Sequence, residues 1–136
     1  NEANEAVKLV LENIMTVTNR YGLTDNKTHL CGFSQGGMIA YSLALQYPDL
    51  FSKVACLSSY PEEKLLNNID RNKKKYENMR FFISHGTEDA VIPLEWGRKA
   101  ADLLYDLSAY FSFREYMSGH GVNQKNYLDL MDFFKK

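Results

Sequence analysis

The stretch Gly32-Phe33-Ser34-Gln35-Gly36 lies between a short apolar run and a segment with helical periodicity. A serine between two glycines at a strand-to-helix junction can form a nucleophile elbow, a tight turn that holds the hydroxyl away from the backbone. Such a serine takes a strained backbone conformation, and side chains two residues before and after it would collide, so both positions favour glycine. The alternative interpretation is a glycine-rich turn with an incidental serine.

The segments on either side of this pentapeptide favour the elbow. Upstream, residues 29–33 have the pattern of a short buried strand. Downstream, apolar residues recur at helical spacing until Pro48 ends the pattern: Met38, Ile39, Leu43 and Ala44. The sequence therefore predicts that Ser34 joins a strand to a helix.

A serine nucleophile needs a base, and the chain has three histidines. His120 lies in a glycine-flanked loop directly after the alternating strand pattern of residues 111–116, where an imidazole can reach the end of a sheet. His29 falls at the start of the strand before Ser34, and we expect it to cap or solvate that strand. His85 follows another buried-strand pattern and is a candidate for a supporting role. His120 is therefore the predicted base.

Two carboxylates could orient that base. Glu88 and Asp89 both lie in the loop that follows the apolar run Arg80–Ser84. Asp89 is favoured because its shorter side chain is held more rigidly at a strand-end turn, and Glu88 remains the alternative. The predicted catalytic residues, Ser34, Asp89 and His120, thus follow three successive strands.

Three groups of residues combine into a more specific signature: Gly32-Phe33-Ser34-Gln35-Gly36-Gly37, then His85-Gly86 with Asp89 and Val91-Ile92-Pro93, then Gly119-His120. Together they resemble the carboxylesterase/phospholipase family of α/β-hydrolases, which includes the acyl-protein thioesterases. The chain order Ser, Asp, His is the one that α/β-hydrolases use. The resemblance implies hydrolysis of carboxylic esters or thioesters, with Ser34 as nucleophile, His120 as general base and Asp89 orienting the imidazole. The backbone N–H of Gln35 would then be one oxyanion donor.

The resemblance also predicts that a segment is missing. Members of the family carry a strand and a His-Gly-type loop well before the serine, and the second oxyanion donor comes from that loop. The present sequence opens in the helix before the nucleophile strand, so we expect it to be the C-terminal portion of an α/β-hydrolase. Without its neighbour, the nucleophile strand would be an apolar edge that pairs with the missing N-terminal segment or with a second copy in a homodimer.

Length and composition agree with a single globular domain over residues 1–136. The chain has 136 residues, 45% hydrophobic and 13% aromatic residues, and a net charge of -1. The near-balanced charge argues against nucleic acid as the main partner. No signal peptide or transmembrane stretch is evident, and no spacing indicates a metal site or another cofactor. Cys31 and Cys56 fall in buried-strand patterns and are interpreted as free thiols of a reducing, cytoplasmic compartment.

Strand patterns alternate with helical ones along the chain, which predicts an α/β fold with a mostly parallel sheet flanked by helices. A first amphipathic helix is expected near the start, a strand over residues 54–58, and two further helices later in the chain. The residues that define these helical faces are Ala3, Val7, Val10, Leu11 and Ile14, then Trp96, Ala100, Leu103, Leu104 and Leu107, and finally Tyr127, Leu130, Met131 and Phe134.

The segment from Pro61 to Asn78 interrupts this alternation. Leu65, Leu66 and Ile69 have helical spacing, and a basic run follows at residues 71–75. Such a run is usually a solvated surface. The alternatives are that the run binds nucleic acid or lipid headgroups, or that it lies at the rim of an active-site entrance.

The sequence thus predicts a serine hydrolase that acts on esters or thioesters through an acyl-enzyme. The alternative from another class is a non-catalytic, truncated α/β-hydrolase module that binds an acyl ligand or a protein partner. The three triad residue types favour the enzyme, and the missing front half favours the module.

Overall fold

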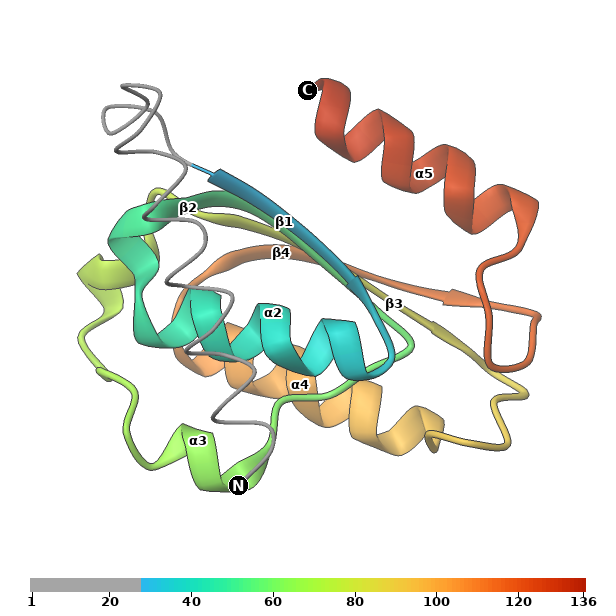
Figure 1. Cartoon of the computed structure of the whole chain (residues 1–136), viewed down its shortest axis with the longest axis horizontal. Coiled ribbons are helices and arrows are strands. Elements are labelled where there is room, and N and C mark those ends of the chain that lie inside the picture. The colour runs from blue at the N-terminus through green and yellow to red at the C-terminus, as the bar shows by residue number, and fades with distance from the viewer. Residues whose placement is uncertain (1–27) are drawn as a thin grey trace.

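A computed structural model describes residues 28–136. Its centre is a four-stranded sheet with the strand order β1-β2-β3-β4. The strands are β1 (Thr28–Phe33), β2 (Phe51–Leu57), β3 (Arg80–Gly86) and β4 (Tyr110–Tyr116). All three pairings are parallel (Figure 1). Each successive strand lies beside the previous one, so the carboxyl ends of all four strands meet at one edge of the sheet.

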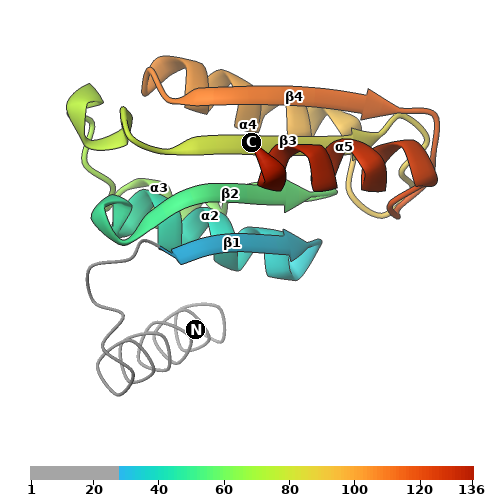
Figure 2. The same cartoon turned by 90° about the horizontal axis from the view of Figure 1, so that it is seen from above.

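Helices cover both faces of this sheet. The helices α2 (Gln35–Gln46) and α4 (Leu94–Asp106) lie on one face, and α5 (Gln124–Lys135) lies on the other (Figure 2). A single helical turn, α3 (Glu63–Leu66), and the 3₁₀ turns Pro48–Leu50 and Lys73–Tyr76 complete the connections. The expected amphipathic helix over Ala3–Ile14 lies outside the described residues. None of the helices in residues 28–136 combines the length and apolar character needed to cross a membrane.

The core has two parts because the side chains of a strand alternate between the faces of the sheet. Val54 and Cys56 of β2 point into the larger cluster beneath α2 and α4, together with Phe81 and Ile83 of β3. The smaller cluster beneath α5 consists of Ala55, Leu57, Phe82 and Leu130, with Phe133 and Phe134 packed against it. The predicted strand at 54–58 is thus confirmed, but it begins three residues earlier.

Residues 29–33 form the predicted strand, but the prediction that this strand is buried is wrong. β1 has the expected bounds, but Cys31 is exposed and Phe33 is 42% exposed. Two features explain the difference. Within the described residues β1 pairs only with β2. The apolar residues of α5 pack over β2 and β3, and the contact of α5 with β1 is made by Phe134 and His29, with 6.0 Å between the ring centroids. Burial of the Cys56 thiol is confirmed, and burial raises its pKa well above the usual value.

The segment from Pro61 to Asn78 differs from its helical prediction. Only Glu63–Leu66 is helical, and the basic residues Lys73–Lys75 lie exposed in the 3₁₀ turn that precedes β3. That turn is at the amino ends of the strands, opposite to the edge where Ser34 lies (Figure 1). The basic run therefore does not rim the site described below.

Candidate active site

Ser34 connects β1 directly to α2 and has a backbone conformation that L-residues rarely adopt. Its φ is 57° and its ψ is -117°. The surrounding backbone holds this conformation through two hydrogen bonds: Ser34 N–H donates to the Leu57 carbonyl (2.8 Å), and the Ser34 carbonyl accepts from Met38 N–H (3.1 Å). The first bond extends the β1–β2 ladder, and the second is the first bond of α2. The predicted strand–serine–helix junction is therefore present, with strain at the serine.

The steric constraints on the glycines around Ser34 differ in part from the prediction. A Cβ on Gly32 would collide with the backbone carbonyl of Gly36, as expected for a tight elbow. A Cβ on Gly36 would meet nothing within 4 Å, so the steric argument for that position is wrong. The second constrained glycine is Gly37, where a Cβ would lie 2.5 Å from Ser59 Cβ and 2.7 Å from its Oγ.

Asp89 lies in the loop between β3 and α4, and its side chain is fully buried. Its Oδ1 accepts hydrogen bonds from the N–H groups of Val91 and Ile92, both at 2.8 Å. Burial on its own would raise the pKa of this carboxyl. Three favourable interactions outweigh that effect, so the pKa lies below its ordinary value. In order of size, they are the hydrogen bond from Ile92 N–H, the interaction with His120 and the hydrogen bond from Val91 N–H. Glu88, the alternative acid, is exposed.

His120 lies between Asp89 and Ser34. Its Nδ1 is 2.8 Å from Asp89 Oδ2, and its Nε2 is 3.1 Å from Ser34 Oγ. Because an ionised carboxylate only accepts, Nδ1–H is the donor to Asp89, and Nε2 is free to accept from the serine hydroxyl. The ring of Phe33 lies against the imidazole, with 4.9 Å between the ring centroids. The structure thus brings together the three side chains that the sequence singled out.

The loop that carries His120 is anchored to α5 and β3 by contacts that the sequence reasoning missed. Before the loop, the Tyr116 hydroxyl donates to Asp129 Oδ2 (2.7 Å), and burial together with this carboxylate raises the pKa of Tyr116. After it, the Asn123 side chain caps α5 by accepting from Asn126 N–H (2.9 Å). The buried Asn126 then donates to Ser84 Oγ (3.0 Å). Only the cap had a recognisable signal in the sequence, an Asn directly before a helical pattern.

The other two histidines lie away from Ser34. His85 is fully buried beneath α4, where Gly97 leaves room for its ring, and its Nε2–H donates to the Ile92 carbonyl (2.7 Å). It therefore braces the loop whose N–H groups hold Asp89, in agreement with the supporting role expected of it. His29 is exposed, and its Nδ1 accepts from Lys53 N–H (3.2 Å). Within residues 28–136, no cluster of three or more His, Cys, Asp or Glu side chains could hold a metal ion.

Gln35 is the first residue of α2 and follows Ser34 directly. The first N–H groups of a helix have no intrahelical acceptor, and the helix dipole favours negative charge in front of them. The N–H of Gln35 is one of these groups, and its role as oxyanion donor stays a prediction.

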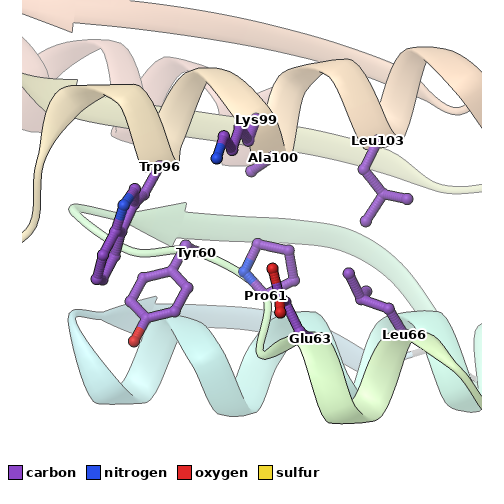
Figure 3. A pocket seen from close by; sticks show the side chains of 8 residues that line it. All are labelled: Tyr60, Pro61, Glu63, Leu66, Trp96, Lys99, Ala100 and Leu103. Atoms are coloured by element: carbon purple, nitrogen blue, oxygen red, sulfur yellow. The ribbon is translucent and has the colours of Figure 1, made fainter.

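A groove of about 450 Å³ lies between α3 and α4 on the face of the sheet that α2 covers. Tyr60 and Trp96 form an edge-to-face pair at one end, with 4.6 Å between the ring centroids, and Leu66 and Leu103 line the other end (Figure 3). The remaining lining residues are Pro61, Glu63, Lys99 and Ala100. The groove is thus mainly apolar, and its aromatic end begins one residue after Ser59.

Comparison with known proteins places this arrangement in a family. The model of the Phospholipase/Carboxylesterase family matches residues 2–136. The chain belongs to that family. The acyl-protein thioesterase 1 of Emericella nidulans is 29% identical over an alignment of 122 residues, and the match covers 85% of this chain and 49% of that protein. The carboxylesterase SOBER1 of Arabidopsis thaliana is 25% identical over an alignment of 118 residues, and the match covers 85% of this chain and 50% of that protein.

Solved structures of the family share the fold. Esterase PE8 superposes with a TM-score of 0.84 at 25% identity, over 98% of this chain and 60% of that one. Arabidopsis SOBER1 gives a TM-score of 0.77 at 24% identity, over 98% of this chain and 63% of that one. The predicted α/β-hydrolase fold and the family resemblance are therefore confirmed. The chain spans about half the length of the curated relatives it matches.

Proposed function

We propose that the protein is a serine hydrolase that cleaves carboxylic esters or thioesters. The observation that carries this proposal is the continuous contact from Asp89 Oδ2 through the imidazole of His120 to Ser34 Oγ. Family membership supports it, since the relatives named above are called thioesterases and carboxylesterases. The strained backbone of Ser34 at the start of α2 is a further support, because the same geometry defines a nucleophile elbow.

In the proposed reaction, Ser34 Oγ attacks the substrate carbonyl while His120 Nε2 takes its proton. The oxyanion is stabilised by Gln35 N–H and by a second donor. The tetrahedral intermediate collapses to an acyl-enzyme, and the alkoxide or thiolate leaves with the proton held by His120. Water then attacks the acyl-enzyme, again with His120 as base. The bond between the acyl carbon and Ser34 Oγ breaks, and His120 returns the proton to Ser34 as the carboxylic acid leaves. Asp89 keeps the proton on Nδ1 and stabilises the imidazolium that forms.

The groove that begins at Tyr60 is the apolar space we propose for the acyl part of the substrate, since the neighbouring Ser59 bonds to the Ser34 carbonyl. The groove beyond Ser59 is lined mostly by aliphatic and aromatic side chains. This supports a small-molecule or lipid acyl substrate. The two free cysteines support a reducing compartment, and we propose the cytoplasm.

Reaction with a fluorophosphonate probe tests the proposal, using protein expressed from its complete reading frame. The wild type should label stoichiometrically, and Ser34→Ala should abolish labelling. Ser34→Ala and His120→Ala should each lower kcat for short acyl esters by on the order of 10⁶-fold, because a hydroxyl without its base is a weak nucleophile.

The matched control is Ser42→Ala, which removes another hydroxyl from α2, one bonded to the Met38 carbonyl. This variant should label like the wild type. Labelling that survives Ser34→Ala would place the nucleophile elsewhere. A wild-type protein that neither labels nor turns over esters would favour the non-catalytic, acyl-binding module.

A further inference from the structure

The side-chain hydroxyl of Ser59 contacts the backbone of Ser34, the proposed nucleophile. Ser59 Oγ–H donates to the Ser34 carbonyl at 2.7 Å, and Ser59 is only 3% exposed. Ser59 follows the end of β2, the strand that pairs with β1, and Ser34 follows the end of β1. The Ser34 carbonyl thus accepts two hydrogen bonds, one from the helix backbone at Met38 and one from this side chain.

The packing around Ser59 fixes the position of its hydroxyl. The side chain lies so close to Gly37 that a Cβ at Gly37 would be 2.5 Å from Ser59 Cβ. Gly37 is therefore small because Ser59 occupies the space beside it. The backbone of Ser58 also takes a left-handed conformation, with φ of 51°, and its N–H donates to the Ser84 carbonyl (2.9 Å). These contacts turn the chain at the end of β2 and hold Ser59 against α2.

The carbonyl that Ser59 holds belongs to the peptide unit that supplies the oxyanion donor. A trans peptide is planar, so the Ser34 carbonyl and the Gln35 N–H are fixed in opposite directions. A hydrogen bond that fixes the carbonyl therefore also fixes the direction of the Gln35 N–H. Hydrogen bonds at the two ends of one peptide also polarise each other, which strengthens the N–H as a donor.

We infer that Ser59 is a positioning residue for the oxyanion site, acting through the Ser34–Gln35 peptide. The inference rests on the proposed hydrolase function and adds to it a side chain that touches neither the substrate nor the triad side chains. Its bond stabilises the tetrahedral intermediate, where negative charge develops in front of Gln35 N–H. It leaves ground-state binding and the Ser34–His120–Asp89 contacts unchanged.

Steady-state hydrolysis of p-nitrophenyl esters by Ser59→Ala, in the protein from the complete reading frame, tests the inference. Loss of a whole oxyanion donor costs about 10²–10³ in kcat, and loss of its support alone should cost less, about 10-fold. KM should stay within about twofold, because only the transition state uses this donor. The pH dependence of kcat/KM, which reports the base, should not move.

Two further variants complete the experiment. Ser42→Ala is the control. It removes a hydroxyl of α2 that is about as buried as that of Ser59 and is bonded to the Met38 carbonyl, and it should keep the wild-type kcat. Ser59→Cys keeps an X–H donor at this position on a somewhat larger side chain, but replaces a strong donor with a weak one, so its loss of kcat should be smaller than that of Ser59→Ala. It also provides the test if Ser59→Ala does not fold.

The outcomes separate this inference from the proposed function. An active wild type with Ser59 variants of unchanged kcat would overturn the role of Ser59 and leave the hydrolase intact. A shifted pH profile in Ser59→Ala would also overturn it, because the triad would then be the part disturbed. A wild type that neither labels nor hydrolyses esters would overturn the proposed function and this inference with it.

Discussion

At the scale of single residues, Asp89 shows how a buried charge is tolerated. Its side chain is fully buried, yet both of its oxygens accept hydrogen bonds, Oδ1 from two backbone N–H groups and Oδ2 from His120. His85 braces the same loop through the Ile92 carbonyl. A carboxylate with this many donors remains ionised in the interior and keeps a fixed direction towards His120.

The ionisation of Asp89 predicts a pH-dependent contribution to stability. Its pKa is depressed because hydrogen bonds from Ile92, His120 and Val91 outweigh the effect of burial. A carboxyl whose pKa is lower in the folded state than in the unfolded state stabilises the fold while it is ionised. This stabilisation is complete above the unfolded-state pKa of about 3.9, and it is lost as the pH falls through the folded-state pKa. The wild type should therefore exceed Asp89→Asn in free energy of unfolding near neutral pH, and the difference should shrink on acidification.

Urea unfolding near neutral pH and below about pH 4 measures that difference. Asp102→Asn, which replaces an exposed carboxylate on α4, is the control for loss of an acidic group. A difference between the wild type and Asp89→Asn that stays constant over this range, or grows towards low pH, would contradict the predicted sign.

At the scale of elements, two adjacent glycines at the start of α2 make different contacts. The backbone carbonyl of Gly36 lies against Gly32 across the turn, while the absence of a side chain at Gly37 leaves space for Ser59. The first contact closes the turn between β1 and α2. The second sets how closely α2 approaches the end of β2.

These roles predict opposite effects for two neighbouring substitutions. Gly37→Ala should lower the free energy of unfolding by about 1–3 kcal/mol, because the new Cβ overlaps Ser59 and the packing must shift. Gly36→Ala has open space around its Cβ and should be neutral or stabilise the protein by up to about 1 kcal/mol, since alanine favours helix. Urea unfolding of both variants measures the contrast, and effects of equal size would contradict this account of the elbow.

The elements that the sequence predicted best are those whose pattern depends on local burial. From Phe81 to Gly86, β3 is buried on both faces, and the three consecutive apolar residues Phe81–Ile83 identify it. The positions of Ser34, Asp89 and His120 at strand ends followed from the same patterns. β1 has apolar residues as well, yet Cys31 is exposed. Burial on this strand depends on where α5 packs, and the sequence of residues 29–33 carries no information about that.

The contacts that support the site could not be predicted, because they join residues far apart in the chain. Ser59 and Gly37 meet only through the β1–β2 pairing, and Asn126 meets Ser84 across 42 residues. Tyr116 and Asp129 are closer in sequence, but neither belongs to a motif. Polar pairs of this kind depend on tertiary packing and have no periodic signal.

At the scale of the whole molecule, the two edges of the described sheet are formed by β1 and β4. The β1 edge adjoins exposed apolar surface, including Phe33. An unpaired edge with apolar surface beside it is a template for association with another chain.

We therefore expect the 136-residue chain, made alone, to dimerise or aggregate. Cys31→Lys places a charge on this edge and should reduce the association. Sedimentation velocity of both forms measures the effect. A monodisperse 136-residue monomer would contradict this expectation.

The separation of Ser34 from His120 by 86 residues has a consequence for the protein during its synthesis. At about 5–20 residues per second, a ribosome adds His120 roughly 4–17 s after Ser34. Until then the serine is an ordinary alcohol, without the base that would make it reactive. The anchors of the His120 loop lie later still, in α5, at Asn126 and Asp129. On the proposed function, a nascent chain therefore exposes no activated nucleophile, and labelling at Ser34 would report that α5 has docked.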